Sequence, residues 1–453
     1  MTITTGCMKP GLHAYPADLV SFIFDRWQTP LFQERLRSAG FDASFPLPDR
    51  AVFGQVISTC YQASLMREEE REVRFRLIIR APKLFPADEG PPTGLHRLEF
   101  ARIRPFNEFE LHRLAPAADF YRTLIGVSLD GKGGVQIWGM VHSGTRWMQV
   151  SFGGRKPVPP LPPVPVIYVT GPGRISVSIG TEMIASLNGG LINCPSLDVF
   201  TSPWLSESFA SVRSEMWELH EAARAKAGKP WATLHPDLGK AIAQQVVRRI
   251  ISVIRNTRHG GTLVYIPSEM SRGILAENRF MTIKYQFRED EPRQRFRTLI
   301  LRIMNTIAEI HGDPKNPGKV IGWDEYASCR CEEIALLDEA IFDVAHFIAA
   351  LSAIDGAVVM TKRQEILGFG GVFSGDVDKV ELVTHALDTE GELSEQELSE
   401  GVGTRHRAAY RLCHELHEAI AIVISQDGNV RLVTWHNGSV TYWDQAATGM
   451  PSF

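Results

Sequence analysis

The sequence predicts an α/β protein in which a mixed β-sheet flanked by helices follows a separate N-terminal α+β domain. Its 453 residues exceed the size at which one hydrophobic core usually stops growing, so two domains are expected. In the second half, apolar strand patterns alternate with helical patterns, which favours a sheet covered by helices on its faces. We predict the boundary near residue 230, which gives residues 1–230 and 231–453 as the two domains.

The N-terminal part mixes short helical stretches with strand patterns, for example at residues 72–79 and 124–129. A proline-rich segment, residues 156–165, is predicted to be a stiff, extended connector, because proline fixes φ and lacks a backbone donor. A recruitment motif is the alternative. Beyond it we expect strands at 166–169 and 174–179 around a Gly-Pro-Gly turn, and a helix at 206–227.

The C-terminal part opens with a predicted helix at residues 237–255, in which apolar residues recur at helical spacing. This helix leads into the apolar strand 262–266. Further helices are predicted at 293–311 and 332–351, and strands at 357–360, 419–424 and 430–435.

Composition excludes several classes of protein. Apolar residues make up 44% and charged residues 22%, which are ordinary globular values. A formal net charge of −4 argues against a broadly basic surface, so we expect no nucleic-acid polymer as a partner and only local phosphate sites. No segment approaches the ~18 to 20 apolar residues of a membrane span, and the first residues lack a signal-peptide core. We therefore expect a cytoplasmic protein with reduced cysteines and no membrane partner.

A basic cluster, Gly403-Thr404-Arg405-His406-Arg407, stands at the start of a predicted helix, whereas P-loop, Rossmann and HExxH motifs are missing. Free backbone N–H groups and the helix dipole favour an anion at such a position. The two guanidinium groups add bidentate donors that match phosphate oxygens. The cluster therefore predicts a triphosphate site, and a solvated helix start is the alternative.

A carboxylate stands at a second corner of the predicted sheet. Asp355-Gly356-Ala357 lies between the end of an apolar helix and an apolar strand, where the glycine permits close backbone approach. Taken alone, Asp355 is typical of a capping or turn aspartate.

Together these segments resemble the diadenylate cyclases, whose two signatures are an Asp-Gly-Ala motif followed by a Gly-Thr-Arg-His-Arg motif. Both stand unaltered in this chain. The segment 260–266 is similar to the early core strand of that family, and 424–428 is similar to the strand and turn after the second motif. The resemblance spans about residues 235–445.

The resemblance implies a role for each signature residue. Asp355 would help to bind Mg²⁺ or Mn²⁺ and activate the attacking 3′-hydroxyl of ATP. Arg405 and Arg407 would hold phosphates, and Thr404 and Ser425 would contact phosphate or ribose. The remaining assignments are His406, which would assist with phosphate or metal, and Gly356, Ala357 and Gly403, which would line the nucleotide site.

The family's reaction condenses two ATP molecules into the second messenger cyclic di-AMP and releases two pyrophosphates. Each protomer binds one ATP, and two protomers face each other, so the resemblance implies a symmetric homo-oligomer. An N-terminal domain in front of such a catalytic domain suggests a sensor, by position alone. Two alternatives remain: a catalytically idle nucleotide-binding sensor, and a related nucleotidyltransferase that makes another product.

Two segments depart from the family pattern. Residues 374–401 form a long, acidic stretch between the two motifs and are predicted to be a solvated surface insertion, which could instead screen the site or gate the dimer face. The extended helical region 293–351 is predicted to carry oligomer contacts.

Overall fold

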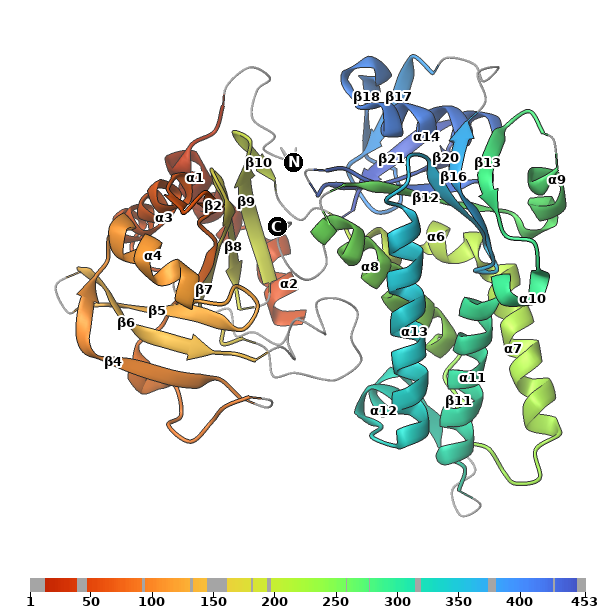
Figure 1. The fold of residues 1–453 in the computed structure, drawn as a ribbon, viewed down its shortest axis with the longest axis horizontal. Helices are drawn as coiled ribbons and strands as arrows, with labels where there is room; N and C mark the ends of the chain where they lie inside the picture. Colours follow the sequence, from red (N-terminus) through yellow and green to blue (C-terminus); the bar gives the residue numbers. More distant parts are fainter. Residues whose placement is uncertain are drawn as a thin grey trace.

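The computed structural model shows two bodies side by side, the N-terminal one coloured red to yellow and the C-terminal one green to blue in Figure 1. Both contain helices packed on β-sheets, so the mixed α/β class is confirmed. The structure describes residues 13–38, 47–91, 94–130, 133–144, 161–180, 182–193, 197–257, 259–276, 278–313, 319–373, 380–426 and 428–445.

The N-terminal body is built on an eight-stranded sheet with the order β10-β9-β8-β7-β3-β5-β6-β4. Neighbouring strands are antiparallel except β3 and β5, which run parallel. The strands are β3 (Phe75–Ile79), β4 (His96–Pro105), β5 (Thr123–Leu129), β6 (Val135–His142), β7 (Pro165–Gly171), β8 (Arg174–Ile179), β9 (Glu182–Asn188) and β10 (Leu191–Asn193), beside the short pair β1 (Arg67–Glu68) and β2 (Arg71–Glu72).

One face of this sheet is covered by α1 (Pro16–Trp27), α3 (Arg50–Leu65) and α4 (Glu108–Leu114), and α2 (Pro30–Ser38) adjoins α1. Helix α3 begins where Asp49 caps it, because the Asp49 carboxylate accepts a hydrogen bond from the Ala51 N–H at 2.9 Å. Phe53 and Ile57 of this helix are fully buried against the sheet.

The proline-rich segment ends inside this body. Leu161 and Val164 are buried in the core on the other face of the sheet, and Pro165 opens strand β7, which pairs with β3 and β8. Residues 156–160, which hold the first part of the predicted connector, lie outside the described residues.

The C-terminal body is built on a nine-stranded mixed sheet with the order β13-β16-β15-β12-β19-β20-β21-β17-β18. Its strands are β12 (Gly261–Ile266), β13 (Met281–Gln286), β15 (Ala357–Thr361), β16 (Ile366–Phe373), β17 (Leu382–Ala386), β18 (Ser394–Leu398), β19 (Ile420–Ile424), β20 (Val430–His436) and β21 (Ser439–Asp444). The separate pair β11 (Thr233–Leu234) and β14 (Val320–Ile321) is parallel.

Helices cover both faces of this sheet. Side chains alternate along β12: Leu263 and Tyr265 face one core, whereas Val264 and Ile266 face the other. The first core is closed by α7 (Ala210–Ala225), α8 (Leu238–Thr257), α11 (Arg295–Ile310) and α13 (Glu332–Leu351), and the second by α14 (Thr404–Glu415). Shorter helices are α6 (Pro203–Ser208), α9 (Ser271–Leu275), α10 (Asp290–Arg293) and α12 (Trp323–Ser328).

The expected helix at 206–227 is two helices, because α6 ends before Phe209 and α7 begins after it. Their residues Leu205 and Met216 belong to the core of the C-terminal body, as does Val199. The division at residue 230 stays a prediction, but the packing joins this segment to the second half of the chain.

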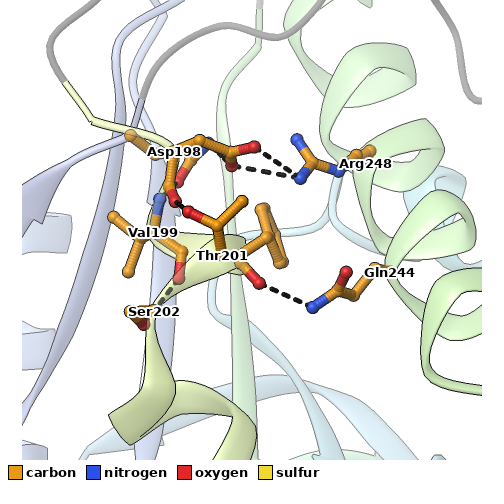
Figure 2. Close-up of polar contacts among 8 residues, drawn as sticks. Asp198, Val199, Thr201, Ser202, Gln244 and Arg248 are labelled. Carbon is orange, nitrogen blue, oxygen red and sulfur yellow. Dashed lines mark hydrogen bonds and ion pairs between the residues drawn. The ribbon is translucent and has the colours of Figure 1, made fainter. Parts of the chain in front are cut away.

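Residues 198–202 are held against helix α8 by polar contacts, which Figure 2 shows. The Asp198 carboxylate accepts hydrogen bonds from Arg248 Nη2 at 2.8 and 3.1 Å, and the Gln244 amide donates to the Phe200 carbonyl oxygen at 2.7 Å. The guanidinium carbon of Arg248 also lies 4.6 Å from the centre of the Phe200 ring. The point where the chain enters the C-terminal body is therefore fixed by side chains of one helix.

The described part of the acidic stretch, which was predicted to be a solvated surface insertion, contains a β-hairpin. Strands β17 and β18 pair antiparallel, and β17 pairs with β21, so the stretch extends the nine-stranded sheet at its edge. Every residue of β18 is exposed, which agrees with the expected solvated surface. Residues 374–379 lie outside the described part.

Candidate nucleotide site at one sheet edge

Strand pairing brings three segments to one edge of the C-terminal sheet. Strands β12 and β15 are parallel, with Thr262 opposite Ala357, so the residues before them lie at the same edge. Strand β19 runs antiparallel to β12, with Ile424 opposite Gly261, so the residues after it reach that edge too. Gly260, Asp355 and Ser425 therefore lie just beyond the ends of neighbouring strands at one edge of the sheet, although they are far apart in sequence.

Arg405 reaches the same edge from helix α14, which packs on β19, β20 and β21. Gly260 has a φ of +66°, and a Cβ added there would stand 3.1 Å from Arg405 Nη1. The same position would be 3.1 Å from the Gln426 nitrogen and 2.7 Å from the Ile424 carbonyl oxygen. The guanidinium thus lies over the backbone where β12 begins and β19 ends.

The start of α14 is open to solvent. Gly403 and Thr404 are exposed, Arg407 is exposed one position after His406, and no side chain caps the helix at Gly403. The first N–H groups of a helix lack intrahelical acceptors, and a helix of 12 residues carries a dipole that favours an anion there. The geometry therefore offers phosphate oxygens backbone donors beside two guanidinium groups.

Asp355 is exposed in the turn between α13 and β15. The next residue, Gly356, has a φ of +119°, and a Cβ added there would lie 2.6 Å from the Gly370 carbonyl carbon. Strand β16 bulges at this point, with register shifts opposite β15. Glycine is needed at position 356 because a side chain there would collide with the backbone of Gly370. The next residue of the motif, Ala357, is buried in the sheet.

Ser425 holds the turn that follows β19. Its Oγ accepts a hydrogen bond from the Asn429 N–H at 3.0 Å, and its carbonyl oxygen accepts one from Gly428 at 3.0 Å. Arg255, which the sequence reasoning missed, donates from Nε to the Gly428 carbonyl oxygen at 2.9 Å. Arg255 is buried among the apolar residues at the end of α8, so only its position near a helix C-terminus could have drawn attention to it.

His406 lies near Arg431 and Asp444 as well as Arg405. Its ring is half-buried, and burial, together with the neighbouring cations Arg431 and Arg405, lowers its pKa to about 4, although the Asp444 carboxylate acts in the opposite direction. Arg431 itself pairs with Asp444, from Nε to Oδ1, at 2.9 Å. A neutral imidazole is the form that can bind a metal ion, whereas the two nearby guanidinium groups repel a cation, so the side chain has features for and against a metal role.

The donor set for a divalent metal is small. Within the described residues, no group of three His, Cys, Asp or Glu side chains is arranged to hold an ion. Asp355 offers one exposed carboxylate beside the predicted phosphate site. Mg²⁺ is commonly held by one or two carboxylates together with substrate phosphates and water, so this arrangement fits a metal that arrives with ATP. Metal binding by Asp355 and His406 stays a prediction.

Comparison with known families supports part of this interpretation. Residues 42–142 match a family model described as "Probable sensor domain DACNV", which is an N-terminal sensor domain of diadenylate cyclases. The match covers less than half of the chain and lies wholly in the N-terminal body. No curated protein and no solved structure gives a significant match to the chain.

The matched region includes the whole of helices α3 and α4 and strands β1 to β6. It therefore covers four of the eight strands of the sheet, whereas helix α3 packs mainly on strands β7 and β8 outside the match. The expectation that the N-terminal part is a sensor, which rested on position alone, gains support from this match. In the described part of the chain, no helix combines the length and apolar character needed to cross a bilayer.

Proposed function

We propose that the protein is a diadenylate cyclase whose N-terminal body regulates a C-terminal catalytic body. The observation that carries the proposal is the convergence of an exposed carboxylate at Asp355 and the open, arginine-bearing start of α14 on one sheet edge. The sensor-domain match at residues 42–142 supports the same conclusion from an independent part of the chain.

In this mechanism the start of α14 and the guanidinium groups of Arg405 and Arg407 bind the triphosphate. They neutralise charge that grows on the phosphate during attack. A bound Mg²⁺ or Mn²⁺ would supply further charge neutralisation and help to orient the phosphates. Asp355 accepts the proton of the attacking 3′-hydroxyl, which its exposure at the sheet edge allows.

Each half-reaction forms one bond and breaks one. The 3′-oxygen of one ATP attacks the α-phosphorus of the other, and the bond from that phosphorus to the pyrophosphate oxygen breaks. Two such steps close the ring and release two pyrophosphates. One site can bind only one of the two nucleotides, so a second copy of the chain must face the first across the exposed edge.

The direct test is to incubate the full chain with ATP and Mg²⁺ or Mn²⁺ and to identify the products by liquid chromatography and mass spectrometry. We expect cyclic di-AMP from the native protein and from Asp324→Asn, an exposed aspartate of α12, but not from Asp355→Asn. A different cyclic or linear product would indicate the related nucleotidyltransferase. ATP that binds but is never converted would indicate the idle nucleotide sensor.

A further inference from the structure

A largely apolar cavity of about 120 Å³ lies between the sheet and helices α6, α7, α8 and α11. Its walls include Phe200, Leu205, Phe209, Met216, Trp217 and Ile422. Genuinely apolar cavities of comparable size stay dry and accept a molecule such as benzene. The cavity is therefore large enough for a small organic ligand.

The cavity is remote from the candidate nucleotide site. Tyr265 lies near the end of β12, whereas Gly261 begins that strand at the nucleotide edge. Ile420 begins β19, and Ile424 ends it beside Ser425. The same two strands thus have the cavity at one end and the nucleotide site at the other.

Two residues that line the cavity each carry a buried polar atom that has no hydrogen-bond partner within the described protein. The side chain of Tyr265 is 2% exposed and its hydroxyl is unpartnered, and burial raises its pKa. Gln364 is 8% exposed and its Oε1 is unpartnered. Buried polar groups in native proteins nearly always have a partner from the protein, from ordered water or from a ligand, so both atoms need a partner from outside the chain.

A positive charge stands at the same wall. Lys362, in the turn between β15 and β16, has its Nζ 5.9 Å from the centre of the Phe209 ring. Burial lowers its pKa, and Glu418 and Glu269 act in the opposite direction without forming an ion pair among the described contacts. By contrast, Arg363 is already paired with Glu215 at 2.6 Å. Two further cations line the wall: Arg213, which donates to the Ser206 carbonyl oxygen, and Lys240. Lys362 is the one that adjoins both unpartnered groups among the described residues, because it contacts the same Phe209 ring as Tyr265 and lies two positions before Gln364.

We propose that this cavity binds a small apolar carboxylate, with the carboxylate on Lys362 and the apolar body among the rings of α6 and α7. The Tyr265 hydroxyl donates to a carboxylate oxygen. The Gln364 amide, which presents either its oxygen or its NH₂ group after a half turn, makes the second polar contact. A neutral ligand of the same shape would leave Lys362 without a partner.

The cavity also borders the point where the chain enters the C-terminal body. Phe200 and Gln244 line the cavity. The hydrogen bond between them and the Asp198–Arg248 ion pair are the contacts that hold residues 198–202 against helix α8 (Figure 2). A bound ligand would stabilise the contacts between residues 198–202 and helix α8, and also the strands β12 and β19. This regulatory step rests on the proposed function: we expect the ligand to change the rate of cyclic di-AMP formation without occupying the nucleotide site.

The binding test uses 4-fluorobenzoate as the probe, with ¹⁹F NMR titration on the full chain, and 4-fluorobenzyl alcohol as the uncharged match. We expect saturable binding of the carboxylate, at least tenfold weaker binding in Lys362→Met and Tyr265→Phe, and native binding in Lys319→Met, an exposed lysine elsewhere. Ala243→Phe, which fills the cavity wall, should abolish binding of both probes while the circular dichroism spectrum and melting temperature stay near native.

Three results would overturn the proposal: no saturable binding by the native chain, equal binding to native and Lys362→Met proteins, or equal affinity for the carboxylate and the alcohol. Equal binding to the native and Lys362→Met proteins would indicate that the probe binds at another site. Equal affinity for the carboxylate and the alcohol would indicate that the charge of the ligand does not contribute to binding. Because this readout needs neither ATP nor turnover, it stands even if no cyclic di-AMP is formed. The effect of the probe on product formation is then measured separately, and an unchanged rate would remove only the regulatory part.

Discussion

The guanidinium of Arg405 lies directly against the backbone of Gly260, where an added Cβ would stand 3.1 Å from Nη1 and 2.7 Å from the Ile424 carbonyl oxygen. This contact joins the second signature motif to the start of strand β12. Since Gly260 has a φ of +66°, it meets two demands that a side chain would violate: a left-handed backbone and room for the guanidinium.

The first prediction concerns Gly260→Ala. The methyl group must displace Arg405 or strain the backbone, and a shift of about 1 Å in a positioned group costs on the order of 100-fold in rate. We therefore expect cyclic di-AMP formation to fall by roughly that factor. The matched control is Gly273→Ala in α9, where nothing lies within 4 Å of the added carbon. Equal activity of both variants would show that this contact does not position Arg405 for catalysis.

A second prediction separates charge from shape at Arg405. Arg405→Lys keeps the positive charge but loses the planar pair of donors that matches a phosphate. We expect ATP to bind about tenfold more weakly, which corresponds to about 1.4 kcal/mol, by isothermal titration calorimetry. Arg411→Lys on the same helix, away from its start, serves as the control and should bind as the native protein does. Native affinity in Arg405→Lys would mean that this side chain contributes charge alone.

How far the sequence predicted the structure depended on whether a segment carried its own periodic signal. Helix α13 spans the predicted residues 332–351 because its apolar run has polar flanks and no internal glycine or proline. The hairpin of β17 and β18 was missed because β18 exposes every residue, so no apolar alternation marks it as a strand. Its pairing with β21 is a tertiary effect that local propensity cannot reveal.

The candidate site shows the same division. The motifs themselves predicted a helix start at Thr404 and a turn at Asp355, and the structure contains both. Their position at one sheet edge follows from the register of β12 with β15 and β19, which no local pattern determines. In the sequence alone, the cavity residues Tyr265 and Lys362 look like an ordinary strand residue and an ordinary turn lysine. The lack of a hydrogen-bond partner for the buried Tyr265 hydroxyl can be recognised only in the folded structure.

A third prediction concerns the ion pair between Asp198 and Arg248. The two side chains are 33% and 13% exposed, so solvent screens the pair only in part, and we expect a coupling free energy of about 1 kcal/mol. A double-mutant cycle of Asp198→Ala, Arg248→Ala and the double variant, followed by urea unfolding, measures it. Additive effects of the two single substitutions would show that the pair does not stabilise the entry of the chain into the C-terminal body.

The last prediction concerns pH and the acidic hairpin. Burial acts to raise the pKa of Asp444, but the hydrogen bond from His385 on β17 and the pairing with Arg431 outweigh it and hold the pKa below its usual value. A carboxyl with a lowered folded-state pKa stabilises the protein above its unfolded pKa of about 3.9, and that stability disappears as pH falls through the lower folded value.

Asp444→Asn should therefore unfold at lower urea concentration than the native protein at pH 7, and the difference should shrink as pH falls below about 4. Neighbouring groups remove part of the water around the carboxylate, but 42% of the Asp444 side-chain surface is still exposed, so solvent weakens the pair and we expect a difference of only about 1 kcal/mol. The control is Asp324→Asn, an exposed residue of α12 outside the nine-stranded sheet, measured in the same way at both pH values. A difference that persists unchanged at low pH would mean that Asp444 acts by packing and not through its charge.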